Sequence, residues 1–274
     1  MGQETATAGP GSMSAEQDPL LGFAAKWDAY LRSDIDMTIS PDETMRGFEW
    51  YHTVGKAGAR AVILACMSSQ LTDVRSLLDM PCGHGRVLRH LVKLFPDAQV
   101  DACDIDRKGA EFCARQFGAG AIISEAEPEA VVFPRKYDVI WVGSLLTHTT
   151  LELTERWLRH LAMQLSDTGI IAATVHGRYS ARRGGEFGYI DAENWQRIVA
   201  EYEETGYGYA NYPFPAHGGN VPGDYGVSLS KASRLISLTE GMDDLRIFNY
   251  IERGWGGHQD LLVVGKPRFI AGLL

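Results

Sequence analysis

The chain is 274 residues long, 45% hydrophobic and 22% charged, and its 35 acidic and 26 basic residues give a formal net charge of -9. This length and composition fit one globular core, with or without an inserted cap. A protein that holds nucleic acid by its charge needs a basic surface, and this balance argues against one. No apolar run reaches the about 18 residues that suggest a membrane helix, so we expect neither nucleic acid nor a membrane as partner.

The cysteines indicate a reducing compartment. They form no CxxC pair and, with the histidines, no zinc-ligand spacing, so we interpret them as free buried thiols and expect no metal site. The N-terminus also lacks the basic start and apolar run of a secretory signal. Together these features predict a cytoplasmic protein.

The first 72 residues divide into a tail and a helical segment. Residues 1–18 are polar and bear Gly, Pro and Ser, which predicts a flexible tail. In residues 19–72, Ser40 and Glu43 have the spacing of a capping box, so a helix is predicted to begin there. A second helix is predicted over residues 56–69. These helices either close over a ligand site or pad the sheet, and padding is the default.

Residues 73–176 alternate short apolar runs with stretches of helix length, and we predict that they form the cofactor-binding core. Apolar strands separated by helices indicate βαβ units in a parallel sheet with right-handed crossovers. The predicted strands are 76–80, 99–103, 121–124, 137–142 and 170–175. The predicted helices are 85–95, 107–117 and 150–165, the last with a capping box at Thr149 and Glu152.

After residue 176 the alternation stops. Residues 177–229 are rich in Gly, Tyr, Pro and Asn, with one predicted helix over 191–205, and so long an irregular stretch predicts a functional cap. Residues 230–267 return to the core sheet. Because only a short turn joins the predicted strands 245–252 and 261–265, these strands must be antiparallel. The predicted fold class is α/β: a doubly wound, mostly parallel seven-stranded sheet with an antiparallel C-terminal hairpin and an inserted cap.

A glycine-rich loop follows the first predicted strand, where doubly wound folds bind ligands. Asp79 ends that strand, and Gly83 and Gly85 permit positive φ angles and close approach of a ligand. The run resembles the first motif of class I S-adenosylmethionine-dependent methyltransferases, with Pro81 in place of the first glycine. The resemblance implies a Rossmann-like fold and S-adenosylmethionine as cofactor. It places Asp79 near the cationic methionine end, with Pro81 and Cys82 in the same binding loop.

The alternative is a nicotinamide or flavin dinucleotide fold. Its GxGxxG fingerprint needs a third glycine that brings helix and strand together beside the pyrophosphate. Counted from Gly83 and Gly85, this glycine falls at Leu88. The dinucleotide alternative is therefore disfavoured.

The second predicted strand ends in acidic residues. Asp104 lies about 20 residues beyond the glycine loop, where a carboxylate can accept both hydroxyls of a ribose, and Ile105 is predicted to pack on the adenine. A capping or turn role for Asp104 is the alternative. Asp106 is the predicted N-cap of the next helix.

The resemblance extends over about residues 74–175 and the terminal hairpin. Glu125 and Ala126 follow the third strand, where the family usually meets the adenine amino group, and Ser144 follows the fourth strand in a further cofactor-binding loop. This loop lacks the Asn/Asp-Pro-Pro-aromatic motif of enzymes that methylate amino groups of nucleic acids. With the acidic net charge, this makes DNA methylation a disfavoured activity.

A histidine is the predicted catalytic residue. A sulfonium is already an activated methyl donor, so the enzyme mainly has to hold the acceptor in line with the methyl carbon. A hydroxyl acceptor would also gain from a general base, and histidine suits that role near neutral pH. His148 follows the fourth strand on the face where the methyl should point, and His176 and His258 are the alternatives. A structural role is the competing interpretation for all three.

Aromatic side chains of the cap are the predicted acceptor contacts. Tyr207, Tyr209 and Tyr212 lie in an aromatic run that ends at residue 215, and we add Trp255 and His258 of the terminal turn. Plugging the open end of the sheet is the alternative for the cap aromatics. The terminal turn looks like that of bacterial methyltransferases of carbohydrate or secondary metabolism.

Two classes of function stay open at this point. One is an active methyltransferase with a small-molecule acceptor, and the other is a scaffold that keeps the cofactor-binding fold without methyl transfer. The four motif residues Asp79, Gly83, Gly85 and Asp104 favour the enzyme. For the assembly state, a homodimer is left open.

Overall fold

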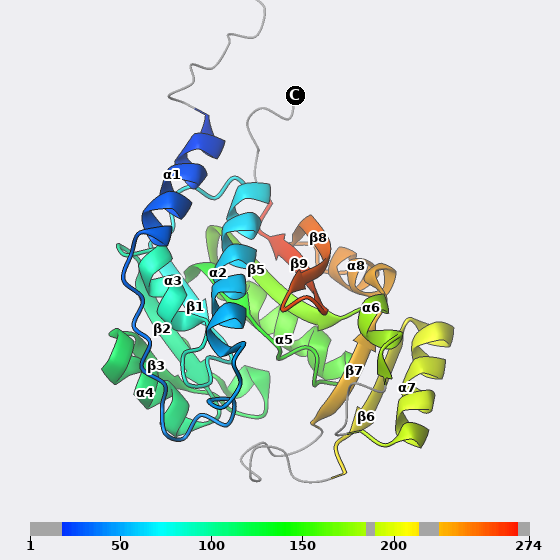
Figure 1. Cartoon of the computed structure of the whole chain (residues 1–274). Coiled ribbons are helices and arrows are strands. Elements are labelled where there is room, and N and C mark those ends of the chain that lie inside the picture. Colours follow the sequence, from blue (N-terminus) through cyan, green and yellow to red (C-terminus); the bar gives the residue numbers. More distant parts are fainter. Residues whose placement is uncertain (1–17, 185–189, 214–224, 268–274) are drawn as a thin grey trace, which may run out of the picture.

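The computed structural model describes residues 18–184, 190–213 and 225–267 (Figure 1). Its core is a seven-stranded sheet of order β3-β2-β1-β4-β5-β9-β8. The strands are β1 (Ser76–Asp79), β2 (Gln99–Asp104), β3 (Gly120–Ile123), β4 (Tyr137–Val142), β5 (Leu165–His176), β8 (Arg246–Trp255) and β9 (Gln259–Gly265). β1 to β5 pair in parallel, whereas β9 runs antiparallel to β5 and to β8. The predicted fold class is confirmed.

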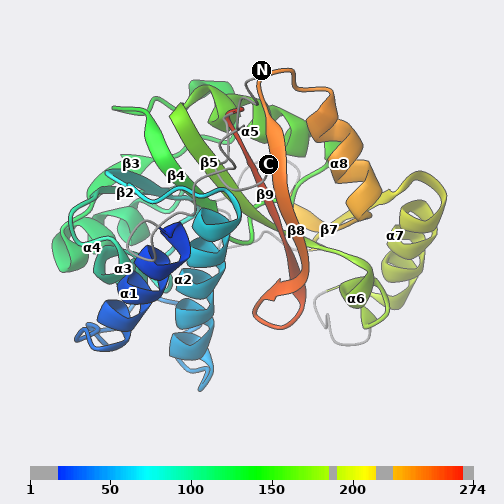
Figure 2. The same ribbon diagram turned by 90° about the horizontal axis from the view of Figure 1, so that it is seen from above.

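Helices cover both faces of this sheet (Figure 2). On one face lie α1 (Pro19–Leu31), α2 (Tyr51–Ser68), α3 (Leu88–Leu94) and α4 (Arg107–Phe117), and on the other lie α5 (Leu151–Met163) and α8 (Ala232–Glu240). Alternate strand residues enter the two cores: Leu77 packs in the cluster with α2, and Leu78 in the cluster with α5. Burial on both faces explains why these strands are apolar runs rather than alternating ones.

The strand order reverses between β1 and β4. From β1 the chain proceeds to β2 and β3 on one side, and it returns to β4 on the other side. Doubly wound sheets bind ligands outside the carboxyl ends of the strands at such a switch point. Asp79, the last residue of β1, is paired with Trp141 of β4, so the loops that follow β1, β2 and β4 meet there.

The helix predicted to begin at Ser40 does not form, and the prediction was wrong. The segment before α2 contains turns, and α2 begins at Tyr51. A capping box needs the Glu43 side chain to return to the Ser40 N–H. Instead, the Glu43 carboxylate accepts hydrogen bonds from the Met45 N–H at 3.0 Å and the Tyr51 hydroxyl at 3.1 Å. We call residues 34–50 the strap, because their contacts lie along the glycine loop.

Two other boundaries differ slightly from those predicted. Asp18, placed in the tail, is the N-cap of α1 and accepts from the Leu20 N–H at 2.9 Å; residues 1–17 lie outside the described residues. The N-cap of α5 is Thr150 rather than Thr149. Thr149 does not serve as the N-cap, because its hydroxyl bonds to the Thr154 hydroxyl at 2.8 Å.

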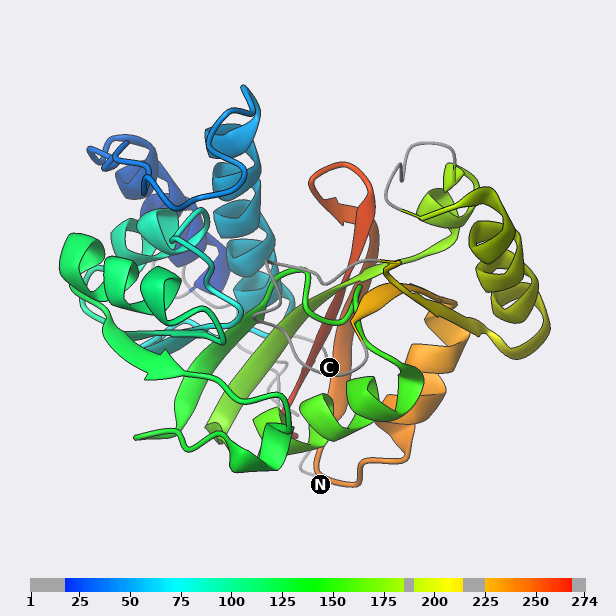
Figure 3. The ribbon, with the colours of Figure 1, turned by 90° about the horizontal axis from the view of Figure 1, so that it is seen from below.

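The predicted cap contains more regular structure than its sequence indicates. α6 (Arg178–Ala181) and α7 (Ala192–Thr205) accompany a separate two-stranded sheet of β6 (Tyr207–Asn211) and β7 (Gly226–Ser230), beside one end of the core (Figure 3). Gly208 and Gly226 interrupt the apolar alternation, so the sequence predicts neither strand. Residues 214 and 215 of the aromatic run lie outside the described residues.

The two-stranded sheet of the cap is hydrogen-bonded to the loop after β4. We call this loop, residues 143–148, loop 4. The Gly226 N–H donates to His148 O at 3.1 Å, and the Ser228 N–H donates to Thr147 O at 2.9 Å. The Ser228 hydroxyl adds a bond to Leu146 O at 2.8 Å. β7 therefore fixes the cap directly to a loop of the switch point.

Among the described helices, none is long and apolar enough to cross a bilayer.

Candidate active site

The glycine loop, residues 80–86, is tied to β2 and packed against α4. The Cys82 N–H donates to Cys103 O at 2.9 Å. Gly85 has a φ of +78°, and a Cβ there would lie 2.4 Å from the Phe117 ring. Only glycine combines this backbone conformation with such close packing. The loop is therefore a tight turn, held by β2 and α4 at the switch point.

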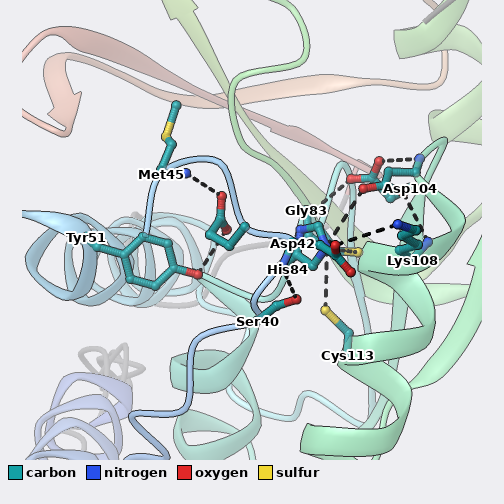
Figure 4. A network of polar contacts seen from close by, with 12 residues as sticks. Ser40, Asp42, Met45, Tyr51, Gly83, His84, Asp104, Lys108 and Cys113 are labelled. Atoms are coloured by element: carbon teal, nitrogen blue, oxygen red, sulfur yellow. Dashed lines mark hydrogen bonds and ion pairs between the residues drawn. The ribbon is translucent and has the colours of Figure 1, made fainter. Parts of the chain in front are cut away.

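Asp104 holds this loop from the end of β2 (Figure 4). Its Oδ2 accepts from the Gly83 N–H at 2.7 Å, and its Oδ1 accepts from the Asp106 N–H at 2.8 Å. A carboxylate offers about four acceptor positions, so the loop-holding role and the predicted ribose-binding role are compatible. Asp106 is the N-cap of α4, as predicted, and accepts from the Lys108 N–H at 3.0 Å.

Asp79 is a buried acid to which the described part of the chain offers no well-aligned partner. Its side chain is 1% exposed, and neither oxygen accepts a well-aligned hydrogen bond from the described residues. Burial raises the pKa of this carboxyl well above its usual range, repulsion by Asp104 adds to the shift, and Arg86 offsets part of it. An unpaired buried carboxyl is costly, and a cationic ligand group would relieve that cost.

The strap is fastened to the glycine loop by a buried arginine. Arg89 of α3 has no exposed surface, and its Nε donates to Gly85 O at 3.0 Å. Its Nη1 donates to Asp36 O at 3.0 Å and Thr38 O at 2.8 Å. One side chain thus joins the strap, α3 and the loop, although nothing in the sequence pattern marks it.

Contacts nearer the surface extend this attachment. Asp42 of the strap forms an ion pair with Lys108 of α4 at 3.6 Å (Figure 4). The Arg86 guanidinium donates to Met45 Sδ at 2.9 Å and lies 5.6 Å from the Trp255 ring. The N-terminal segment therefore borders the predicted cofactor site as well as padding the sheet.

His148 lies where loop 4 meets the cap. Its Nδ1 is 2.8 Å from Gly226 O and 2.9 Å from the Tyr212 hydroxyl. Its ring stacks on Tyr225 with 4.8 Å between the ring centroids. A carbonyl oxygen can only accept, so the bond to Gly226 favours the tautomer with the proton on Nδ1 and the basic lone pair on Nε2.

The other candidate histidines lie in a row with His148. His176 is 6.5 Å from His148 and 5.9 Å from His258 between ring centroids. Burial lowers the pKa of His176 well below its usual value, and the neighbouring histidines lower it further. His176 is therefore poorly suited to take up a proton. Within the described ranges, no three His, Cys, Asp or Glu side chains are placed to hold a metal ion.

Four of the five predicted acceptor residues fall into two groups. Tyr212 and His258 lie in the aromatic cluster around His148 and His176. Tyr207 and Trp255 are buried anchors: the Tyr207 hydroxyl donates to Thr149 O at 2.8 Å, and the Trp255 indole donates to Val54 O at 3.0 Å. These contacts favour the structural alternative for both residues.

The remaining predicted residues lie nearer the surface. Tyr209 lies on the cap, where its hydroxyl donates to Asn211 Oδ1 at 2.6 Å. Pro81, Ile105 and Ala126 are partly exposed and Glu125 is exposed, all in loops at the carboxyl ends of β1 to β3. Tyr225 is a member of the site that the sequence does not predict, since its neighbour Gly226 suggests only a turn.

Comparison with known proteins finds similarity to methyltransferases. A family model described as a methyltransferase domain matches residues 78–171. A search of curated proteins finds no match. A solved S-adenosylmethionine-dependent methyltransferase from Clostridium acetobutylicum ATCC 824 superposes with a TM-score of 0.54 at 14% identity, over 92% of this chain and 100% of that chain.

Two further solved structures share the fold. The plantazolicin methyltransferase BpumL, in complex with a pentazolic desmethylPZN analog and SAH, has a TM-score of 0.54 at 14% identity, over 91% of this chain and 97% of that chain. The mitomycin 7-O-methyltransferase MmcR has a TM-score of 0.50 at 14% identity. The superposition covers 78% of this chain but about half, 54%, of MmcR.

The matched residues include the features that the sequence singles out. They contain Asp79, the glycine loop and Asp104, and they run from β1 into β5. The sheet adds the antiparallel terminal strands expected for the fold. Leu88, the first residue of α3, stands where a dinucleotide fold needs its third glycine, and its side chain is fully buried against β2 and α4. Residues 78–171 therefore match a methyltransferase domain, and the sheet has the Rossmann-like fold of a solved S-adenosylmethionine-dependent methyltransferase.

Proposed function

We propose that the protein transfers the methyl group of S-adenosylmethionine to a small-molecule acceptor. The observation that carries the proposal is the buried Asp79 carboxyl, which lacks a well-aligned donor within the described residues. The cationic methionine end of the cofactor fits this position, because it would supply hydrogen bonds and favour the ionised carboxylate. When bound, the cofactor supplies an activated methyl group on its sulfonium.

The other predicted cofactor residues follow from the same placement. Asp104 accepts the ribose hydroxyls while it holds the Gly83 N–H, and Pro81, Cys82 and Gly85 shape the loop. The Ser124 N–H donates to Asp104 O at 2.9 Å, and this supports an adenine pocket bordered by the next residues, Glu125 and Ala126. Ile105 packs on the adenine, and Ser144 borders the methionine end.

His148 acts as general base in this proposal. Its Nδ1 is directed to Gly226 O, so Nε2 accepts the proton of an acceptor hydroxyl. Tyr212 and Tyr225 provide aromatic surface beside it. This combination of a base with flat aromatic surface suits a hydroxyl on a carbohydrate or a secondary metabolite. Four buried, reduced cysteines support a cytosolic setting.

The cofactor assignment predicts selective binding. Titration calorimetry of the protein should detect binding of S-adenosylmethionine and S-adenosylhomocysteine and none of NAD or FAD. Because the pKa of Asp79 is raised, the cationic ligand should ionise this carboxyl and release a proton, so the measured heat should vary with the ionisation enthalpy of the buffer. Tight binding of NAD, or no binding of either adenosyl ligand, would contradict the proposal.

Asp104 provides a second test of the cofactor site. Asp104→Ala should weaken S-adenosylhomocysteine binding by about 1.5–3 kcal/mol, the scale of hydrogen bonds to a charged group. The matched control is Asp191→Ala, which removes a capping carboxylate from α7 that accepts from the Asn194 N–H at 2.8 Å. The control should lower stability by about 0.5–2 kcal/mol without changing affinity. If Asp104 had only a capping role, Asp104→Ala would behave like the control and lose stability without losing affinity.

A further inference from the structure

We propose that Thr174 and Gln259 are positioning residues that fix loop 4 for methyl transfer. The inference rests on the proposed function and deepens it, because the sequence predicts no role for either residue. Thr174 belongs to β5, and Gln259 begins β9. They act through Ser144 of loop 4, not on the acceptor or the cofactor.

A closed ring of hydrogen bonds joins the three residues through the Ser144 N–H and the three side chains. The Ser144 N–H donates to Thr174 Oγ1 at 2.8 Å, and the Thr174 hydroxyl donates to Gln259 Oε1 at 2.6 Å. Gln259 Nε2 donates to Ser144 Oγ at 3.1 Å and so returns to the residue where the ring began. Loop 4, β5 and β9 are therefore held at one point.

The directions of these bonds are consistent with one another. Ser144 Oγ accepts from Gln259, so its own proton can go to Thr147 Oγ1, 3.1 Å away. The Thr147 hydroxyl in turn donates to Ser144 O at 3.1 Å. In this arrangement each of the three hydroxyls donates once, and the bonds around the ring polarise one another.

The ring supports a backbone conformation that serine avoids. Ser144 has a φ of +65°, in the left-handed region. A non-glycine residue stays there only when its surroundings hold it, and such residues gather at functional sites. Thr174 has no exposed surface and Gln259 is 5% exposed, so water cannot replace a lost partner easily.

The ring also lies at the switch point. Asp79 pairs with Trp141 on β4, and Ser144 follows Trp141 by three residues. Asp79 and Ser144 therefore both lie at the carboxyl edge of the sheet. On its other side, loop 4 bonds to β7 of the cap through Leu146, Thr147 and His148. The segment that carries the proposed base is therefore held between the ring and the cap.

The test compares buried threonines by their effect on cofactor affinity. Thr174→Val leaves the Ser144 N–H and Gln259 Oε1 without their partner, so S-adenosylhomocysteine affinity measured by calorimetry should fall about 5- to 50-fold. Thr174→Ser keeps the hydroxyl and should restore most of the affinity. The matched control is Thr239→Val on α8, where another buried hydroxyl, bonded to Leu235 O at 2.9 Å, is lost away from the site.

A second readout separates positioning from plain stability. Hydrogen exchange of the Ser144 amide should accelerate in Thr174→Val and stay unchanged in Thr239→Val, even if both variants melt at a similar temperature. Should Thr174→Val fail to fold, Gln259→Met opens the same ring with a side chain of similar length, and the same losses are expected. Thr174→Val or Gln259→Met with faster Ser144 exchange but wild-type affinity would overturn this inference alone. A wild-type protein that binds no S-adenosylhomocysteine would instead overturn the proposed function.

Discussion

Replacing His148 by alanine is expected to lower the maximal rate of methyl transfer by about 10²–10⁴-fold, the range of general base catalysis. The imidazole lies at the end of loop 4, and its Nδ1 is directed to Gly226 O, which leaves Nε2 as the basic nitrogen. A base is needed only if the acceptor loses a proton before the methyl arrives. The affinity for S-adenosylhomocysteine should stay nearly unchanged, because the cofactor residues belong to the glycine loop and to β2.

The measurement is the pH dependence of the rate with an acceptor found by screening carbohydrate and secondary-metabolite hydroxyls. A protonated imidazole cannot accept a proton, so the wild-type rate should fall at low pH. The His148→Ala rate should lack this fall and should rise on addition of free imidazole. Tyr212→Phe is the control, since it removes only the hydroxyl 2.9 Å from Nδ1. An active His148→Ala enzyme with the wild-type pH profile would remove this residue from the mechanism.

The second large effect is expected at Arg89. Arg89→Met keeps the bulk of the side chain but removes the donors to Gly85 O, Asp36 O and Thr38 O. A buried carbonyl without a donor costs about 1–3 kcal/mol. The Asp36 and Thr38 carbonyls are only partly buried, so water can replace part of what they lose. We therefore expect the free energy of unfolding to fall by about 2–4 kcal/mol, measured by urea denaturation.

The strap should also loosen in this variant. Hydrogen exchange in residues 34–50 should accelerate, and S-adenosylhomocysteine affinity should fall, because Gly85 loses one of its fixed contacts. Arg159→Met is the control: this exposed side chain pairs with Glu155 one helical turn away at 2.7 Å, and such pairs contribute about 0.3–0.5 kcal/mol. Equal stability of the two variants would show that Arg89 does not hold the strap.

The local part of the site could be predicted from the sequence. Asp79, Gly83 and Gly85 are close in the chain, and their role as a strand end and a turn depends on backbone chemistry that is visible at each residue. Asp106 was predicted as an N-cap for the same reason, and the structure confirms it. The parallel βαβ core could likewise be predicted, because short apolar runs alternate with stretches of helix length.

The remainder depends on contacts between distant parts of the chain. Ser40 has the local signature of a helix start, but Tyr51 draws the Glu43 carboxylate away from the cap. Thr174 and Gln259 are 85 residues apart and meet only because β5 and β9 pair. Single-sequence patterns do not contain that pairing, so the ring has no sequence signal.

The bonds between β7 and loop 4 limit how the cap can change during evolution or design. Caps that recognise different acceptors are often imagined as modules exchanged on a constant core. Here the Gly226 N–H and the Ser228 N–H donate to carbonyl oxygens of His148 and Thr147. A cap taken from another enzyme, without β7 in the same register against loop 4, would leave these two carbonyl oxygens unpaired. The His148 side chain would then no longer be held in place. A recombined enzyme would therefore have to inherit loop 4 and β7 from the same parent, as a single unit of exchange.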